Sequence, residues 1–225
     1  MEKVVGSRCF HPDLLQGSLD WHACRTTCDL TASEVGTAIG IGYASRASLI
    51  RVKLGVDEPE PENEYMQFGR DYESLVAEAY EGALHVKTDT FGFATLELPC
   101  GLKLGASPDR LYTQRLVEIK CSKKERMEPH PAHLAQMLIQ SVIFDIPEVD
   151  YVCWSPSQVD PEDNCMILKI ARVRFDPRLW TDHVLPALQY YKRLVANQTT
   201  AMVKTHEKKQ MLAAFAKYTI ITPLY

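Results

Sequence analysis

The stretch that decides the fold is "SPDRLYTQRLVEIKC", which occupies Ser107–Cys121. Within it, "LVEIK" alternates apolar and charged residues, and this alternation predicts a β-strand with one face in the core. Val117 and Ile119 are expected to point into that core. Glu118 and Lys120 then lie next to each other on the opposite face. A strand that only filled a core would not carry two opposite charges on one face.

Asp109 ends the hairpin arm before this strand and is expected to lie opposite Glu118. Two close carboxylates repel each other, and oxygen ligands of this kind suit Mg²⁺. A bound metal polarises a phosphate and lowers the pKa of a bound water, while Lys120 can orient that water or help to deprotonate it. The set predicts phosphodiester hydrolysis. The competing interpretation is a surface Glu–Lys pair with a capping aspartate.

The composition is that of an ordinary globular protein. The chain has 225 residues, of which 46% are hydrophobic and 24% charged. It contains no apolar run of the roughly 20 residues that cross a bilayer, and its N-terminus lacks the features of a signal peptide. Seven cysteines without an export signal predict reduced thiols and a cytoplasmic or intracellular location. The spacing of Cys24 and Cys28 does not favour zinc, because no second close cysteine pair follows.

The formal net charge of -4 argues mildly against non-specific nucleic-acid binding, but it does not exclude a local basic groove. We expect one domain over residues 1–225. It has an N-terminal helical portion over about 1–82 and a sheet-containing catalytic core over about 83–225.

Helix signals dominate the first portion. Thr31 and Glu34 fit a capping box at the start of a helix that stops near Gly40. Ser45 is expected to cap a second helix, closed by Gly55. The longest early helix runs over 63–82, with apolar residues at steps of three and four.

The chain then changes to short apolar pieces over 85–121, which predict an antiparallel meander. Helix is expected again over 130–146, two further strands over 149–155 and 166–175, and a long amphipathic helix over 177–197. The fold class is therefore α/β or α+β, with a central β-sheet flanked by helices.

Tyr65, Tyr72 and Tyr80 recur on the apolar stripe of the long helix, and we interpret them as core residues rather than a base-stacking set. Glu73 lies beside this stripe. His133 is expected to be a surface residue or a support for the site rather than a catalyst.

Six stretches occur in an order that resembles a known family: "LTASEVGTAIG", "LIRVKLG", "FGRDYESLVAEAY", "GASPD", "VEIKC" and "HLAQMLIQ". Over about Trp21–Phe144 the chain resembles the YqaJ-type viral recombinases. This phage lambda exonuclease-like family of PD-(D/E)XK nucleases includes viral alkaline exonucleases. The resemblance implies a central mixed β-sheet with a restriction-endonuclease-like core.

The resemblance also implies an activity. It is a Mg²⁺-dependent exodeoxyribonuclease that degrades the 5′-ended strand of linear duplex DNA and leaves 3′ overhangs for recombination. Two Mg²⁺ ions are implied, for which Mn²⁺ can substitute. The implied partners are linear duplex DNA with a 5′-phosphate end, a single-strand annealing protein and further copies in a homotrimer, with no membrane.

Site roles follow from the same resemblance. Asp109 and Glu118 resemble the metal ligands, together with the backbone carbonyl of Ile119. Lys120 resembles the lysine that positions the attacking water. Glu73 resembles a helix-borne carboxylate near a second metal, although a solvated helix residue would look the same.

Further residues complete the implied site. Gln136 resembles a glutamine that holds the water or the metal shell, and Gln140, one turn later, fits the helix equally well. Ser107 resembles a phosphate contact. Members of the family usually carry glycine after the catalytic aspartate, where this chain has Arg110. That residue is an additional candidate for a DNA phosphate contact.

The helix that follows Thr31 presents unpaired N–H groups, which favour anion binding. Ser33 can add a hydroxyl, and Arg25 can reach the same point with a guanidinium suited to phosphate. In the family the matching residues hold a terminal 5′-phosphate. The competing interpretation is a helix cap and an exposed charge.

Three alternatives remain open at the level of function. An endonuclease with the same metal core would cut circular DNA. A DNA-end-binding protein with a decayed active site would bind without cutting, and an acid cluster could be purely structural.

Overall fold

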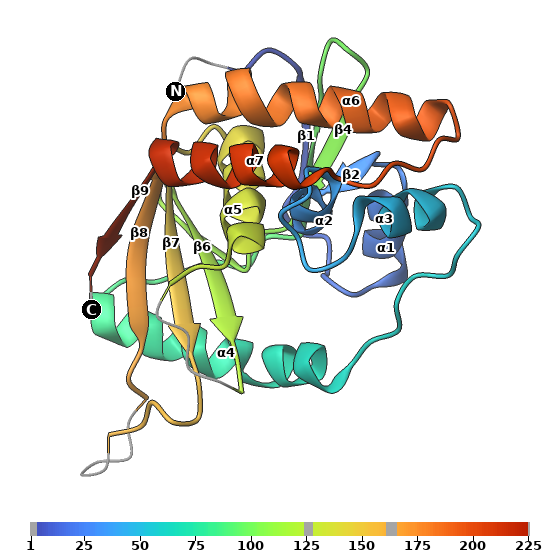
Figure 1. The fold of residues 1–225 in the computed structure, drawn as a ribbon. Helices are drawn as coiled ribbons and strands as arrows, with labels where there is room; N and C mark the ends of the chain where they lie inside the picture. Colours follow the sequence, from blue (N-terminus) through green and yellow to red (C-terminus); the bar gives the residue numbers. More distant parts are fainter. Residues whose placement is uncertain (1–3, 124–127, 161–165, 225) are drawn as a thin grey trace.

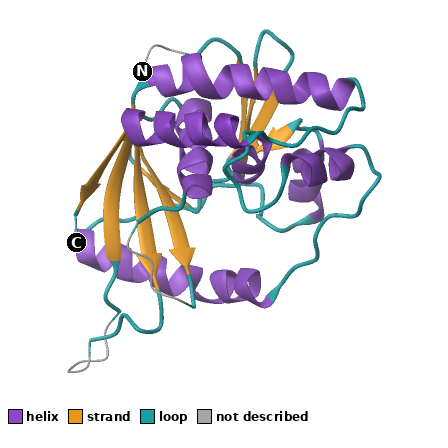
Figure 2. Ribbon diagram, in the orientation of Figure 1, coloured by secondary structure: helices purple, strands orange, loops and turns teal. Residues whose placement is uncertain are grey.

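Two β-sheets with helices packed against them make up the computed structural model, which describes residues 4–123, 128–160 and 166–224 (Figure 1, Figure 2). The first sheet contains, in order of pairing, β1 (Ser7–His11), β3 (Phe93–Glu97), β4 (Lys103–Ala106) and β2 (Leu30–Thr31). The second contains β5 (Arg110–Tyr112), β6 (Arg115–Cys121), β7 (Glu148–Trp154), β8 (Lys169–Phe175) and β9 (Thr219–Pro223).

The helices are α1 (Leu19–Thr26), α2 (Ala32–Ala38), α3 (Arg46–Lys53), α4 (Glu64–Leu84), α5 (Pro131–Phe144), α6 (Leu185–Ala196) and α7 (Thr205–Tyr218). A π-helical segment, η1 (Leu179–Val184), leads directly into α6. The predicted helices and the mixed sheet are confirmed. Strand β6 pairs in parallel with β7, and α5 provides the connection between them.

The expected single meander over 85–121 is wrong. Strands β3 and β4 form one antiparallel hairpin and β5 and β6 another, but the two hairpins belong to different sheets. Pro108 lies between them, and because proline has no N–H it cannot continue a strand ladder. The chain therefore leaves the first sheet immediately before Asp109.

The sequence predicted a helical N-terminal portion, but this portion also contains two strands. Strand β1 pairs with β3 in antiparallel orientation, and β2 pairs with β4 in parallel.

Helix α7 and strand β9 at the C-terminal end were not predicted. The apolar signal of α7 is weak, since only Ala214 and Phe215 are buried in it.

The second sheet separates two clusters of buried residues. Successive side chains of β6 point alternately toward one cluster and the other. Val117 and Ile119 pack with Val76 and Tyr80 of α4. Leu116 belongs to the larger cluster, which includes residues of α2, α5 and α6. The predicted alternation of β6 is therefore confirmed, and Glu118 faces α5 rather than α4.

Helix α4 is longer than the sheet that it covers, and Figure 1 shows it continuing past the tip of β6. Tyr80 is fully buried and Tyr72 half-buried, but the side chain of Tyr65 is 60% exposed. The expectation that all three tyrosines are core residues is thus wrong for Tyr65. Its turn of the helix has no strand beneath it.

The predicted helix starts are confirmed in atomic detail. The Thr31 N–H donates to the Glu34 carboxylate at 2.7 Å, and the Ser45 hydroxyl accepts from the Ser48 N–H at 3.0 Å. The side chain of Asn63 caps α4 in the same way.

No helix in the described part of the chain is long and apolar enough to span a membrane. The described cysteines are free thiols. Cys165 lies outside the described residues.

Candidate active site

Three charged side chains meet at the end of β6. The Asp109 carboxylate accepts the backbone N–H of Ile119 at 2.7 Å, which fixes it opposite the strand. Glu118 is fully buried, and the Lys120 ammonium group forms an ion pair with it. The structure therefore brings Asp109, Glu118 and Lys120 together, as the alternation of β6 predicts.

The site holds two carboxylates in a poorly solvated place. Burial, and next the charge of Asp109, raise the pKa of Glu118 from 4.5 to about 7, against the effect of Lys120. Burial alone would lower the pKa of Lys120, but the charges of Glu118 and Asp109 outweigh it and raise that pKa. Lys120 therefore remains protonated at neutral pH, and the repulsion between the acids is only partly relieved.

A glutamine of α5 completes the surroundings of Glu118. The amide group of Gln140 donates to the Glu118 carboxylate at 2.6 Å. The Gln140 carbonyl oxygen is buried and accepts no hydrogen bond from the described residues. Gln136 is half-buried one turn earlier and is not the residue that contacts Glu118. The two positions differ by one helical turn, so the sequence pattern could not separate them.

Glu73 of α4 approaches the cluster from the other side. Burial, and next the charge of Asp109, raise the pKa of Glu73. The Arg110 guanidinium group contacts the Glu73 carboxylate at 3.2 Å and donates to the backbone carbonyl of Asp109 at 2.6 Å. Arg110 thus occupies the space between these acids, and it is not a free surface cation.

These groups fit a hard divalent cation. Asp109, Glu118 and Glu73 supply carboxylate oxygens. Burial, and next repulsion from Asp109, raise the pKa values of Glu118 and Glu73, and a bound cation would offset both effects. The unpartnered Gln140 oxygen can accept a hydrogen bond from a metal-bound water. Among the described residues, no three His, Cys, Asp or Glu side chains converge tightly enough to hold a metal alone, so backbone or water oxygens would have to complete the shell of a bound cation.

The residues expected to bind a terminal phosphate lie on the N-terminal elements. The Arg25 guanidinium group lies 4.4 Å above the ring of Trp21, and burial lowers its pKa. The indole N–H of Trp21 donates to the Ser107 hydroxyl at 2.9 Å, and that hydroxyl donates to the Gly92 carbonyl at 2.5 Å. Ser33 is exposed in the first turn of α2. Trp21, which sequence reasoning did not select, therefore connects Arg25 to Ser107.

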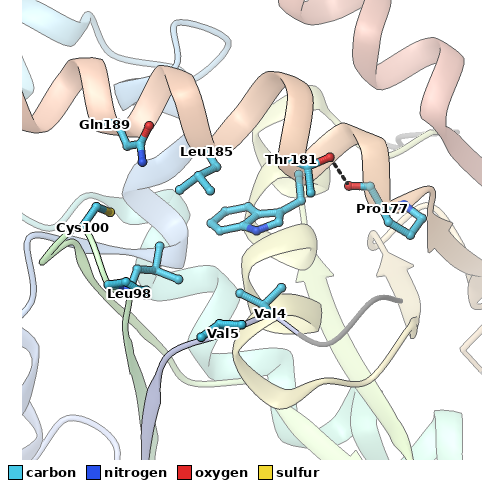
Figure 3. Close-up of a pocket in the computed structure, with 10 residues that line it drawn as sticks. Val4, Val5, Leu98, Cys100, Pro177, Thr181, Leu185 and Gln189 are labelled. Atoms are coloured by element: carbon cyan, nitrogen blue, oxygen red, sulfur yellow. Dashed lines mark hydrogen bonds between the residues drawn. The ribbon is translucent and has the colours of Figure 1, made fainter.

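A separate hollow of about 410 Å³ lies against η1 and the start of α6. Figure 3 shows Leu98, Leu185 and Val4 around it. Its lining is mostly apolar and includes no charged side chain, so it offers no carboxylate for a hard cation. The carboxylate cluster at the end of β6 is therefore the candidate active site.

Several solved structures have a fold similar to that of this chain. An alkaline exonuclease from Laribacter hongkongensis is 22% identical, with a TM-score of 0.61, over 89% of this chain and 99% of that one. The same enzyme in complex with dAMP gives a TM-score of 0.62 at 22% identity, with the same coverage. A phage-related exonuclease from Haemophilus somnus 129PT is 12% identical, with a TM-score of 0.57, over 76% of this chain and 96% of that one. These similarities show a common fold and confirm the expected fold class.

No curated protein matches the chain in sequence. The model of the YqaJ-like viral recombinase domain matches residues 20–147, which is more than half of the chain. This span agrees with the stretch over which the motifs resemble that family. It includes β6, the preceding Asp109 and all of α5. The chain belongs to the YqaJ-like viral recombinase family.

Proposed function

We propose that this protein is a Mg²⁺-dependent exonuclease that degrades the 5′-ended strand of linear duplex DNA and leaves 3′ overhangs for recombination. The observation that carries the proposal is the convergence of Asp109, Glu118 and Lys120 at the end of β6. Membership of a recombinase family and the fold shared with two exonucleases support it. One of these relatives was solved with dAMP, a mononucleotide of the kind that an exonuclease releases.

Each residue of the cluster has a proposed part in the reaction. Asp109 and Glu118 would hold Mg²⁺, together with the carbonyl of Ile119, and Glu73 would support a second ion. Mg²⁺ supplies a polarised phosphate and a water of lowered pKa, and we expect Mn²⁺ to substitute for it. Lys120 is protonated in the metal-free site, and it is proposed to orient the attacking water and to balance negative charge in the transition state.

Gln140, rather than Gln136, is proposed to hold the water, because its free carbonyl oxygen lies beside Glu118. In the hydrolysis itself, the water oxygen bonds to phosphorus while the P–O3′ bond breaks. The products are a 5′-mononucleotide and a strand shortened by one residue.

The polarity of digestion rests on the N-terminal phosphate residues. Arg25 and Ser33 are proposed to bind the terminal 5′-phosphate, since a guanidinium group and a hydroxyl suit a dianion. Ser107, expected as a phosphate contact, already donates its hydroxyl proton to the Gly92 carbonyl, so it is proposed to hold Trp21 beside this phosphate instead. The hydrogen bond from Trp21 to Ser107 supports a common scaffold for Arg25 and Ser107. A single-strand annealing protein as partner and assembly as a homotrimer are further proposals from the family resemblance.

End-labelled linear duplex and closed circular DNA, each with and without Mg²⁺, test the proposal. We expect digestion of linear DNA only, and only with the metal. Digestion of both substrates would make the protein an endonuclease. Binding of ends without digestion would indicate a decayed active site. A 5′-phosphorylated duplex should be digested faster than a 5′-hydroxyl duplex, and equal rates would contradict the phosphate site.

A further inference from the structure

A hollow of about 650 Å³ adjoins the active site on the side of Lys120. It lies between the end of β6, the start of α4, and the segment that contains Tyr43. Its walls include Tyr43, Tyr65, Met66, Lys120, Lys123 and His133. Small-molecule sites usually measure about 300–1,000 Å³, so this volume admits a nucleoside but not a duplex.

Two tyrosine rings in this hollow are held in place and yet open to solvent. The ring of Tyr43 stacks on His130, with centroids 4.2 Å apart and planes 14° apart, and its hydroxyl lies 3.1 Å from Nε2 of His133. The side chain of Tyr43 is still 65% exposed, and that of Tyr65 is 60% exposed. Lys123 lies over the Tyr65 ring, 5.2 Å from its centroid. Ordered aromatic faces open to solvent suit a flat, apolar ligand with polar edges.

The charges around the hollow disfavour a phosphate as its main occupant. Lys123 is paired with Glu64 at 2.7 Å, and Lys120 is paired with Glu118. The hollow is also lined by a carboxylate, Glu60. With both cations engaged and an acid in the wall, aromatic stacking is the attraction that this surface offers.

On the basis of the proposed function, we propose that this hollow receives the nucleobase of a nucleotide adjoining the scissile phosphate, stacked against Tyr65 and Tyr43. Lys120 belongs both to the hollow and to the carboxylate cluster, so a phosphate at the cluster has its nucleoside beside these rings. The base must leave its pair to enter, at an energetic cost that stacking offsets. The hollow thereby helps to separate the degraded strand from its complement.

Single-turnover digestion of end-labelled duplexes tests this base site. The substrates carry an abasic residue at the first or the second position of the 5′-ended strand, and an intact duplex serves as reference. Stacking on an aromatic side chain is worth enough to predict a roughly tenfold slower reaction for Tyr65→Ala on intact DNA. The abasic residue at one of the two positions should slow the unmutated protein similarly. The two changes together should be little worse than either alone.

Matched variants separate stacking from folding. Tyr65→Phe should keep the rate, since the ring remains, and Tyr43→Ala should behave like Tyr65→Ala. Tyr190→Ala removes another exposed tyrosine, from α6, and should change nothing. The inference would be overturned if the rate losses from Tyr65→Ala and from the abasic residue simply multiplied when combined. It would also be overturned if neither change slowed the reaction.

A binding measurement distinguishes failure of the base site from failure of the proposed function. A single-stranded oligonucleotide with 2-aminopurine next to its 5′ end is titrated with metal-free protein, so no cleavage is needed. Stacking quenches the fluorophore, and Tyr65→Ala should weaken that quenching. Quenching that depends on Tyr65 would support the base site even if the protein digested no DNA. Digestion of DNA without such quenching would contradict the base site and leave the proposed exonuclease function standing.

Discussion

At the scale of single residues, the Glu118 carboxyl group contributes to how the stability of the metal-free protein depends on pH. Its pKa is raised from 4.5 to about 7, so the folded state holds a proton that the unfolded chain releases. Its contribution to the free energy of unfolding is therefore complete below pH 4.5 and is lost as the pH rises through 7. Thermal melts of the metal-free protein should show this decline, and Glu118→Gln should flatten it. A decline of equal size in the variant would assign it to another group.

Asp109 combines a charge with a structural hydrogen bond, and the two can be separated. Asp109→Asn keeps an oxygen that can accept the Ile119 N–H but removes the negative charge. We expect cleavage to fall at least about a hundredfold, as for loss of a metal-binding or general catalyst, with the fold retained. Initial rates with Mg²⁺ and circular dichroism check this. Asp109→Ala should in addition lose about 1–3 kcal/mol of stability, because a strand N–H loses its partner.

Gln140 and Gln136 provide a matched pair of positions on one helix. Gln140→Leu removes a hydrogen bond to a buried carboxylate, worth about 1.5–3 kcal/mol, and the oxygen proposed to hold the water. We expect kcat to fall roughly ten- to a hundredfold, and the pKa of Glu118 to rise further. Gln136→Leu should leave kcat within about threefold. The pH–rate profiles of both variants measure this. A larger loss from Gln136→Leu would return the role to that residue.

At the scale of elements, helix α1 is fastened to the connection between β4 and β5 through Trp21. Trp21→Phe keeps a ring beneath Arg25 but deletes the N–H that Ser107 accepts, a bond worth about 1 kcal/mol. The preference for 5′-phosphorylated ends should fall by about fivefold, the equivalent of that energy. Digestion of 5′-hydroxyl ends should hardly change. Competition between labelled 5′-phosphorylated and 5′-hydroxyl duplexes measures this preference. An equal loss of rate on both substrates would show that Trp21 acts on the metal cluster instead.

At the scale of the whole molecule, Asp150 on β7 holds helix α4 and strand β8 to the sheet. Its buried carboxylate accepts from the Tyr80 hydroxyl at 2.8 Å and from Arg172 at 2.9 Å. Asp150→Ala should cost about 3 kcal/mol in urea unfolding, the lower end for a broken buried pair, because Arg172 is partly exposed. Glu148→Ala, on the same strand, should cost about 1 kcal/mol or less, because its ion pairs are more solvated. Similar losses from both variants would contradict the role of Asp150.

The sequence by itself determined the features that depend on neighbouring residues. The alternation in β6 placed Val117 in the core and Glu118 opposite Asp109, because strand geometry fixes where successive side chains point. Local caps likewise fixed the starts of α2 and α3, since each uses a side chain within three residues of the helix end.

Only the tertiary structure decided the features that depend on where distant elements stop or touch. Gln140 rather than Gln136 meets Glu118, because the packing of α5 selects which turn lies over β6. Tyr65 is exposed because α4 continues past the sheet, which no periodicity within the helix can report. Pro108 breaks the chain between the two hairpins, but only the tertiary structure placed β4 beside β2 in one sheet and β6 beside β7 in the other. Such contacts are long-range packing choices, and a local pattern contains no information about which partner is available.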